Sequence, residues 1–265
     1  MALNIGFVGA GNMGGAILRG FVASGSVLPK NIYVSDHHES KLNALNEACD
    51  KKLNVYTDSI ELLNEDLDVV ILAIKPQVMG EFIKQAKSLL ENKIVVSIAA
   101  GITLNTLEEL MPNSKVVRVM PNLPVAYCMG ACAICSNADT ETITTIEDLF
   151  GVLGSAYTMT EAQLDIEAAV VGCSPAFFAL YIDAFTRAAI KQGMSSESAR
   201  NMLLSTMQGT AYELLQTQEH PRSYMDTVTS PGGTTACALY AMENDVMSGA
   251  YNAIEAALKR TEELS

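Results

Sequence analysis

The fold of this 265-residue chain is decided near its beginning, by the stretch NIGFVGAGNMGGAILRGFVAS at residues 4–24. A short apolar run leads into three glycines spaced as GxGxxG, and an amphipathic helical pattern follows at once. The first glycine permits a tight turn, the second lets a pyrophosphate approach the backbone, and the third allows close helix–strand packing. Spacing alone would fit an ordinary glycine-rich turn. The strand–turn–helix context favours a dinucleotide site at the start of a helix, formed by Gly9, Ala10, Gly11, Asn12, Met13 and Gly14.

Outward from this motif, short apolar runs alternate with helical patterns over the first 160 residues. We expect strands at residues 4–8, 31–35, 69–74, 94–98, 115–120 and 131–136, and helices at residues 13–23, 40–49 and 78–90. Strands that alternate with helices of this length predict a parallel, doubly wound sheet. The run at residues 68–74 is apolar on both faces, as a central strand covered by helices requires.

The pattern changes near Thr160, after which we expect long helices and no strand. Residues 161–194 are apolar around much of the helix circumference, so this stretch must be buried, and one small domain offers too little cover. We therefore expect an α/β fold with two domains. Residues 1–160 form a Rossmann-type dinucleotide-binding domain, and residues 161–265 form a helical domain that binds substrate and pairs with a second copy.

The composition indicates a globular protein, with 49% hydrophobic and 18% charged residues. The net charge of −13 repels phosphate backbones and anionic membranes, so we expect no nucleic-acid or membrane partner. No signal-peptide pattern precedes the glycine-rich turn, and we expect a cytoplasmic protein. Cysteines stand at positions 128, 132 and 135 without a histidine nearby, so we expect reduced thiols and no metal site.

The second expected strand ends at Ser35 and Asp36, where Rossmann domains place the acidic residue that binds the ribose hydroxyls. An aspartate there disfavours the extra phosphate of NADPH. His37 and His38 follow, and protonated imidazoles would neutralise that phosphate; they fit equally well in a solvated loop without a cofactor role. The sequence therefore predicts NADPH or NADH as the cofactor and does not choose between them.

A second glycine-rich motif, VTSPGGTTACAL, occupies residues 228–239. Proline ends the preceding element, two glycines free the backbone, and hydroxyl residues lead into a helix. The N–H groups of Gly232, Gly233, Thr234 and Thr235 would converge on an anion such as a carboxylate. An ordinary N-capped helix is the alternative, but a single Ser or Thr satisfies a cap. The motif favours an anion site.

Together with four further segments, these motifs make the sequence resemble the pyrroline-5-carboxylate reductases, which produce L-proline. The further segments are AIKPQ at 73–77, SIAAGI at 97–102, RVMPN at 118–122 and His220-Pro221. The motif at 230–239 is the specific one, because glycine fingerprints recur in many dehydrogenases. The resemblance covers essentially the full chain, with its segments in the same order.

The resemblance implies NAD(P)H-dependent reduction of 1-pyrroline-5-carboxylate to L-proline, the last step of proline biosynthesis. It also implies a homodimer, with larger rings of dimers common. Gly232–Thr235 would hold the substrate carboxylate, with Ser230 in the same loop and Thr235 near the ring nitrogen as the catalytic residue. The cofactor would be lined by Ala73, Ile74, Lys75, Pro76, Ala99 and Ala100, and by Ser59 where a family asparagine often approaches it.

The sequence departs from the family pattern at two segments that bear on turnover and substrate range. GCSPAF at 172–177 replaces the usual GSGPAY; Leu123 replaces a threonine, and residues 125–129 lack the usual acidic residue. Two alternatives follow: a reductase of another small cyclic imine or oxo acid, and a non-catalytic nucleotide-binding regulator. A β-hydroxyacid dehydrogenase would need a catalytic lysine in the helical domain, and Lys191 fits better as the polar end of a buried helix.

Overall fold

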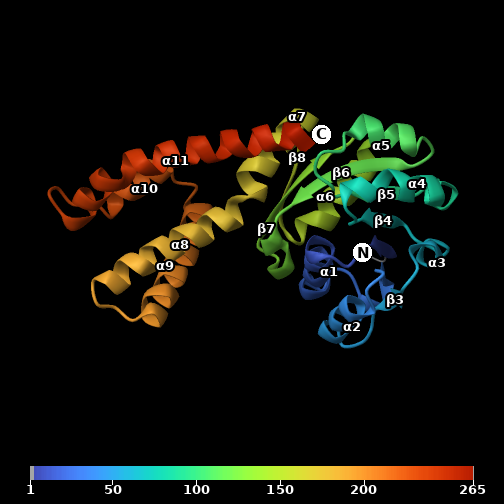
Figure 1. Ribbon diagram of the computed structural model, residues 1–265, viewed down its shortest axis with the longest axis horizontal. Coiled ribbons are helices and arrows are strands. Elements are labelled where there is room, and N and C mark those ends of the chain that lie inside the picture. Colours follow the sequence, from blue (N-terminus) through green and yellow to red (C-terminus); the bar gives the residue numbers. More distant parts are fainter. Residues whose placement is uncertain (1–2, 265) are drawn as a thin grey trace. The chain divides into compact units, whose positions relative to one another are not determined.

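The computed structural model describes residues 3–264, so the outermost ends of the two expected domains, residues 1–2 and 265, lie outside the described residues. The chain divides into two compact units (Figure 1). Residues up to Pro175, together with those from Leu258 onward, form the first unit, and residues 176–257 form the second. The expected domain boundary at residue 160 stays a prediction. The helix α7 (Glu161–Glu167) begins where the sequence pattern changes, but it still contacts the sheet of the first unit.

The first unit is built on one eight-stranded sheet with the order β3-β2-β1-β4-β5-β6-β7-β8. The six expected strands are confirmed, and β3 and β8 are additional. Both additions are edge strands with partly or fully exposed side chains and a weak apolar pattern, which explains why the sequence did not reveal them. The strands are β1 (Ile5–Val8), β2 (Ile32–Ser35), β3 (Asn54–Tyr56), β4 (Val69–Leu72), β5 (Ile94–Ser97), β6 (Lys115–Pro121), β7 (Gly130–Cys135) and β8 (Gly154–Thr158).

The expectation of a wholly parallel sheet is wrong at one edge. The first six strands run parallel, but β7 pairs antiparallel with β6, and β8 runs parallel to β7. The connection from β6 to β7 holds only the 3-10 turn η2 (Leu123–Tyr127). A parallel connection needs a crossover of a dozen or more residues, so this short link reverses the chain direction.

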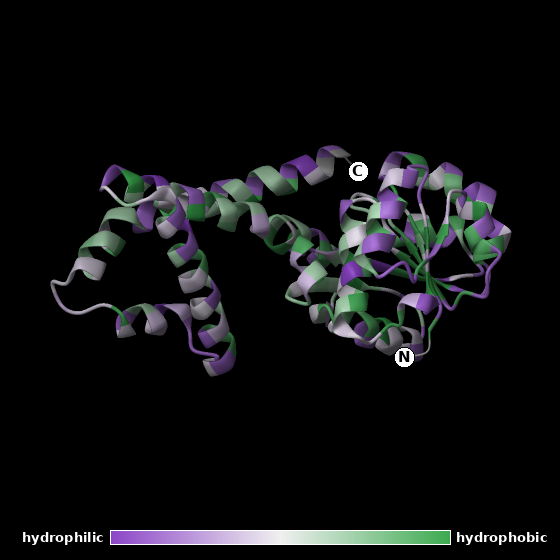
Figure 2. Cartoon of the chain, turned by 90° about the horizontal axis from the view of Figure 1, so that it is seen from below, coloured by the Kyte–Doolittle hydropathy of each residue, from purple (hydrophilic) through white to green (hydrophobic). Residues whose placement is uncertain are grey.

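Helices cover both faces of the sheet and enclose two separate cores. Along β4, Val69 and Ile71 belong to one core and Val70 and Leu72 to the other, because successive side chains point to opposite faces. Figure 2 shows the strands as the most uniformly hydrophobic part of this unit. The covering elements are α1 (Asn12–Ser24), α2 (Glu39–Ala48), α3 (Ser59–Leu63), α4 (Pro76–Leu90), α5 (Leu104–Leu110), α6 (Thr140–Gly151) and α7, with the short turns η1 (Pro29–Asn31) and η3 (Ala168–Gly172).

A buried ion pair fixes α7 to the sheet. The Arg118 side chain on β6 is 3% exposed; it pairs with the Glu161 carboxylate and donates to Asp165 Oδ1 at 3.3 Å. Glu161 Oε1 also accepts a hydrogen bond from the N–H of Leu104 at 2.5 Å. A guanidinium buried without partners would cost several kcal/mol, so the sheet holds this helix through its carboxylates.

The second unit is helical, as expected. It is formed by α8 (Ser174–Lys191), α9 (Ser196–Thr217), α10 (Pro221–Thr227) and α11 (Thr234–Leu264), the first and last of which begin or end in the first unit. Among residues 176–257, only Thr186 and Ala199 are buried. The unit therefore lacks a hydrophobic core of its own. The described helical stretch Glu161–Lys191 is long and apolar enough to cross a membrane, and only 6% of its most apolar 18 residues are buried.

Candidate active site

The three glycines of the first motif differ in what surrounds them. Gly9 has φ +107°, and a Cβ there would stand 2.5 Å from the carbonyl oxygen of Ala73. A Cβ on Gly14 would stand 2.5 Å from the carbonyl oxygen of Gly9. A Cβ on Gly11, by contrast, would meet nothing within 4 Å. Gly9 and Gly14 thus permit close packing, while Gly11 leaves open space over the backbone, which fits the approach of a pyrophosphate.

The start of α1 is free to bind an anion. Gly11 is the N-cap residue, no side chain caps the helix, and the first helical bond runs from Gly15 N–H to Gly11 O at 2.8 Å. The preceding N–H groups have no intrahelical partner and lie at the positive end of the helix dipole. This geometry fits an anion site at the GxGxxG motif, which stays a prediction.

A cavity of about 410 Å³ opens beside this turn. Of its lining residues, only Ala10, Gly11 and Asn12 were expected from the sequence as cofactor neighbours, and the charged side chains of Arg19 and Lys41 were not. Arg19 follows Gly11 and Gly15 at four-residue intervals on α1, a spacing that could have revealed it. The cavity is lined by Ala10, Gly11, Asn12, Gly15, Arg19, Lys41, Ala44, Leu45 and Leu123.

Asp36 follows β2 directly and bonds to the glycine-rich turn. Its Oδ2 accepts the N–H of Ala10 at 3.0 Å, and its Oδ1 accepts the N–H and the ring Nδ1 of His38, each at 2.9 Å. Lys41 Nζ lies 3.8 Å from Oδ2. Burial alone would raise the pKa of Asp36, but the hydrogen bonds from His38 and Ala10 and the charge of Lys41 together lower it below its usual value. The carboxylate is therefore ionised at neutral pH.

The other expected cofactor residues lie at the same edge of the sheet. Val8 pairs in register with Ser35 and with Leu72, and Leu72 pairs with Ser97, so the chain leaves β1, β2, β4 and β5 side by side. The residues that follow β4 are Ala73, Ile74, Lys75 and Pro76, and those that follow β5 include Ala99 and Ala100. Ser59 joins this edge because its Oγ lies 2.9 Å from Ser35 Oγ.

A buried acid near this edge was missed by the sequence reading. Both carboxylate oxygens of Glu167, at the end of α7, are buried without a hydrogen-bond partner among the described residues. Burial raises the pKa of Glu167 to about 7. Burial also raises the pKa of Cys132 on β7 to about 12, with a contribution from the nearby Glu167 charge. The signal that could have found it is an acidic residue followed directly by the apolar run Ala168–Val171.

In the second unit, the expected anion loop contains a tight turn. The N–H of Gly233 donates to the carbonyl oxygen of Ser230 at 2.9 Å, and Gly232 has φ +68°, as in type II turns with proline second. The amide of Gly233 is thus used within the turn, whereas the sequence reading had counted it among the anion donors. The helix α11 starts at Thr234, so the N–H groups of Thr234 and Thr235 remain at its positive end.

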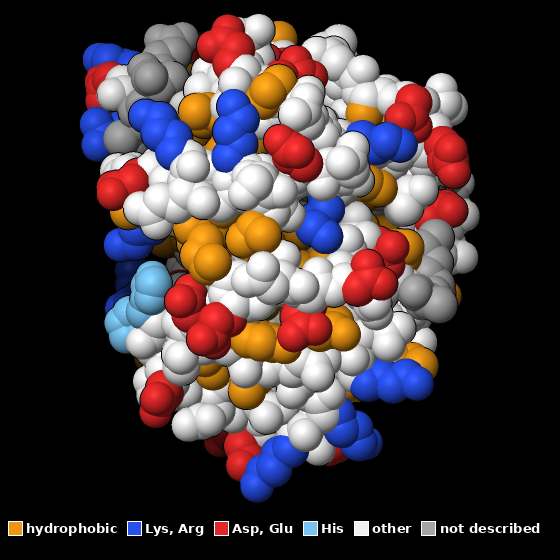
Figure 3. Space-filling model, turned by 90° about the vertical axis from the view of Figure 1, so that its right-hand side faces the viewer, with side chains coloured by type: hydrophobic (Ala, Val, Ile, Leu, Met, Phe, Trp, Pro, Cys, Tyr) orange, Lys and Arg blue, Asp and Glu red, His pale blue; other side chains and the backbone are white. Residues whose placement is uncertain are grey.

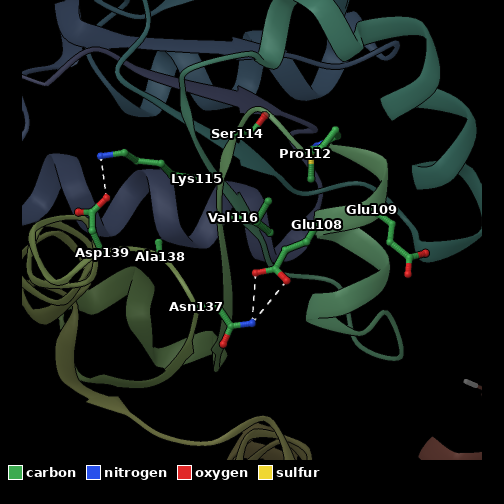
Figure 4. Close-up of a pocket in the computed structure, with 10 residues that line it drawn as sticks. Glu108, Glu109, Pro112, Ser114, Lys115, Val116, Asn137, Ala138 and Asp139 are labelled. Carbon is green, nitrogen blue, oxygen red and sulfur yellow. Dashed lines mark hydrogen bonds and ion pairs between the residues drawn. The ribbon is translucent and has the colours of Figure 1, made fainter.

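Elsewhere, a cavity of about 470 Å³ lies beside the amino end of β6, away from the cofactor edge (Figure 4). Four of its polar side chains form two pairs: Asn137 Nδ2 donates to Glu108 Oε1 at 3.3 Å, and Lys115 Nζ lies 3.0 Å from Asp139 Oδ2. Figure 3 shows acidic and basic side chains interspersed over one face of the molecule, between small hydrophobic groups. Within residues 3–264, no three His, Cys, Asp or Glu side chains are grouped to hold a metal ion.

Two family models match this chain, one over the GxGxxG motif and one over the motif at residues 228–239. Residues 161–264 match the family model for pyrroline-5-carboxylate reductase dimerisation, and residues 4–101 match that for NADP oxidoreductase, coenzyme F420-dependent. The pyrroline-5-carboxylate reductase of Arabidopsis thaliana is 37% identical, over 100% of this chain and 96% of the relative. That of Methanosarcina acetivorans is 36% identical, over 98% and 97%.

A solved structure agrees as well. The Plasmodium falciparum pyrroline carboxylate reductase, crystallised with NADP bound, has a TM-score of 0.88 and 28% identity, and the match covers 99% of this chain and 98% of that one. With relatives above 30% identity along nearly its whole length, this chain belongs to the pyrroline-5-carboxylate reductase family.

Proposed function

We propose that this chain reduces 1-pyrroline-5-carboxylate to L-proline with NADPH or NADH, the last step of proline biosynthesis. The observation that carries the proposal is the presence of two open helix starts, each preceded by a glycine-rich turn, on a chain of this family. One lies at Gly11 before α1, and the other at Gly233 before α11. Two anion-binding helix starts match a dinucleotide pyrophosphate and a substrate carboxylate.

The cofactor would be held at the carboxyl edge of the sheet. Gly9–Gly14 would hold the pyrophosphate, and Asp36 the ribose. Ser59, Ala73, Ile74, Lys75, Pro76, Ala99 and Ala100 would line the rest of the site. When bound, the reduced nicotinamide supplies the hydride. The open space above Gly11 and the ionised carboxylate of Asp36 support this arrangement.

The substrate is a five-membered cyclic imine that carries a carboxylate. The loop from Ser230 through Gly232 and Gly233 positions the N–H groups of Thr234 and Thr235, which would bind that carboxylate. The hydroxyl of Thr235 would orient the imine nitrogen. An alcohol is a poor proton source, and a protonated imine already carries the proton that proline keeps on nitrogen. Catalysis then rests on alignment of the imine carbon with the incoming hydride.

The functional form would be a homodimer joined through the helical unit, with rings of dimers as a further assembly. The family model matched by residues 161–264 describes dimerisation, and the exposed apolar residues of α8 supply the surface. We assign the apolar stretch Glu161–Lys191 to this interface and not to a bilayer. The net charge of −13 supports a protein without nucleic-acid or anionic-membrane partners, and the proposed location is the cytoplasm.

The direct test is oxidation of NADH and of NADPH by purified protein, with and without 1-pyrroline-5-carboxylate. The proposal predicts rapid oxidation that depends on this substrate. A six-membered cyclic imine carboxylate and a small oxo acid serve as competing substrates. Preference for either would favour a related reductase with an altered pocket. No oxidation by folded protein that binds cofactor would favour a regulator.

A further inference from the structure

The carboxylate of Asp36 is held more firmly than binding of a ribose requires. Its side chain is only 11% exposed, although it stands at the end of a strand beside a cavity. One oxygen bonds to the backbone of the glycine-rich turn at Ala10, and the other is held twice by His38, the N-cap residue of α2. The carboxylate thus ties the phosphate-binding turn to the start of α2 and has little freedom to rotate away.

The hydrogen bonds leave this carboxylate one open acceptor position. Two carboxylate oxygens offer about four lone-pair sites in total. The N–H and Nδ1 of His38 use both sites of Oδ1, and the N–H of Ala10 uses one site of Oδ2. Because a carboxylate only accepts, Nδ1 of His38 carries the hydrogen in this contact. The remaining site on Oδ2 can accept one hydroxyl group, and it cannot accept from a phosphate, which has no hydrogen to donate at neutral pH.

The basic side chains near Asp36 either contact its carboxylate or lie beside the glycine-rich turn. Lys41 Nζ lies 3.8 Å from Oδ2, and the His38 ring contacts Oδ1, so both face the carboxylate. Arg19 lies over Gly15, where its Nη1 would be 3.4 Å from an added Cβ, and it lines the cavity beside the turn that would hold the pyrophosphate. His37 and Glu39 are exposed neighbours with opposite charge when His37 is protonated. Among the described residues that contact Asp36, the basic side chains of His38 and Lys41 already face its carboxylate, so neither is left unpaired for a further phosphate dianion.

From this geometry we propose that Asp36, held in place by Ala10 and His38, makes this chain selective for NADH over NADPH. Asp36 accepts the ribose hydroxyl of NADH and repels the 2′-phosphate of NADPH, and His38 is a positioning residue that prevents the carboxylate from turning aside. The inference rests on the proposed function, which assigns a nicotinamide dinucleotide to this site, and it selects NADH from the two proposed cofactors. It distinguishes this chain from the relative crystallised with NADP.

The test measures binding and not turnover. NADH and NADPH are titrated against the full-length protein by nicotinamide fluorescence, and ADP-ribose and its 2′-phosphate are titrated by calorimetry. Wild-type protein should bind NADH at least about tenfold more tightly than NADPH, since like charges in contact are strongly disfavoured at a partly buried site. The ADP-ribose pair should show the same ratio, because the discrimination lies at the adenosine end.

Three variants complete the test. Asp36→Asn keeps an oxygen for the N–H of Ala10 and removes the charge, so it should reduce the NADH preference about tenfold. His38→Ala should reduce it by a smaller factor, about threefold, because the carboxylate gains freedom. Glu39→Gln removes a neighbouring negative charge in the same helical turn and should leave the ratio within twofold.

Wild-type protein that binds NADPH as tightly as NADH would overturn the proposal. So would Asp36→Asn if it weakened both cofactors equally, or Glu39→Gln if it changed the ratio as much as Asp36→Asn. These outcomes are separate from failure of the proposed function. That failure would appear as tight, selective NADH binding without oxidation when 1-pyrroline-5-carboxylate is added.

Discussion

The two units of this chain differ in how they bury apolar surface. The sheet unit encloses two cores in which side chains such as Phe7, Phe21 and Met79 are fully buried. The helical unit leaves Phe178 56% exposed and Leu180 68% exposed on α8. Full burial of a side chain of this size would contribute roughly 1.5–3 kcal/mol to stability. The sheet unit thus encloses its own cores, while the helical unit leaves apolar side chains exposed that a second copy of the chain would cover.

The comparison also separates the two anion sites. The proposed cofactor site lies at a strand edge above two buried cores, and the proposed substrate loop precedes a helix in a unit whose apolar side chains are largely exposed. Cofactor binding should therefore survive loss of the dimer, while turnover should not. Each of the following variants tests one side of this difference.

The largest effect is expected at the exposed apolar surface of α8. The double substitution Phe178→Asp and Tyr181→Asp places two charges three residues apart, on one face of the helix. Hot-spot residues contribute about 2 kcal/mol or more each, so the dimer dissociation constant should rise at least about 100-fold and turnover should fall with it. Analytical ultracentrifugation, turnover and NADH titration measure the three quantities.

Lys191→Gln is the matched control at the end of the same helix. It should leave the dimer and the activity unchanged. It also tests the β-hydroxyacid dehydrogenase alternative, which needs this lysine. A double variant that remains a wild-type dimer would contradict the assignment of this surface to the interface.

Two glycine substitutions should separate folding from binding within the sheet unit. Gly14→Ala forces a Cβ to 2.8 Å from Ala73 Cβ and should lower the free energy of unfolding by about 1–3 kcal/mol, as overpacking does. Gly11→Ala meets no protein atom and should melt like wild type, yet bind NADH at least about tenfold more weakly, because the methyl group stands where the pyrophosphate approaches. Thermal denaturation and fluorescence titration measure the two effects. Normal NADH affinity in Gly11→Ala would remove the pyrophosphate from this turn.

A hydroxyl deletion in the substrate loop should affect turnover alone. Thr235→Ala should lower kcat by roughly 10–100-fold, the range expected when one orienting group is lost, while folding and cofactor binding remain. The control is Thr227→Ala on α10, whose hydroxyl donates to the carbonyl oxygen of Tyr224 at 2.7 Å. Steady-state kinetics at saturating cofactor compare the two variants. Wild-type kinetics in Thr235→Ala would exclude Thr235 from the mechanism.

The smallest effect concerns the buried acid of the sheet unit. Burial raises the pKa of Glu167 from 4.5 to about 7, so the folded state binds this proton more tightly than the unfolded state does. The stability that the proton contributes is complete below the unfolded value and is lost as the pH rises through 7. Glu167→Gln should therefore gain stability over wild type by roughly 1–2 kcal/mol between pH 5 and pH 8.5, after allowance for partial exposure. Urea denaturation at both pH values measures the gain; a difference independent of pH would show that Glu167 does not titrate in this range.

Much of the fold could be predicted because local and long-range signals agree. Strands apolar on both faces, such as residues 69–72, require helices on each side, and the glycine-rich turn fixes the first strand–helix unit. The short edge strands β3 and β8 lacked such a signal, since their side chains are half exposed. The antiparallel direction of β7 depends on the shortness of the connection from β6. The apolar pattern predicts strands but does not give their direction.

The site was predictable where backbone geometry defines it and not where side chains meet across the fold. The spacing of the three glycines predicts the turn that they form, and Asp36 is predicted because it directly follows the second strand. The contact of Asp36 with Ala10 is a tertiary contact, which the sequence pattern does not show. The contacts of Asp36 with His38 and of Arg19 with Gly15 are local along the chain. The use of the Gly233 amide inside a turn is local, but Pro231 and Gly232 signal that turn only when read as a type II sequence.

The central claim, that this chain transfers a hydride to the imine carbon of 1-pyrroline-5-carboxylate, is tested most directly by isotope transfer. The protein is incubated with the substrate and with NADH or NADPH that carries deuterium at both positions on C4 of the nicotinamide. Mass spectrometry and NMR then locate the label in the product. The account predicts L-proline with one deuterium on the ring carbon bonded to nitrogen and distant from the carboxylate. Unlabelled substrate recovered in the presence of folded, cofactor-bound dimer would contradict it.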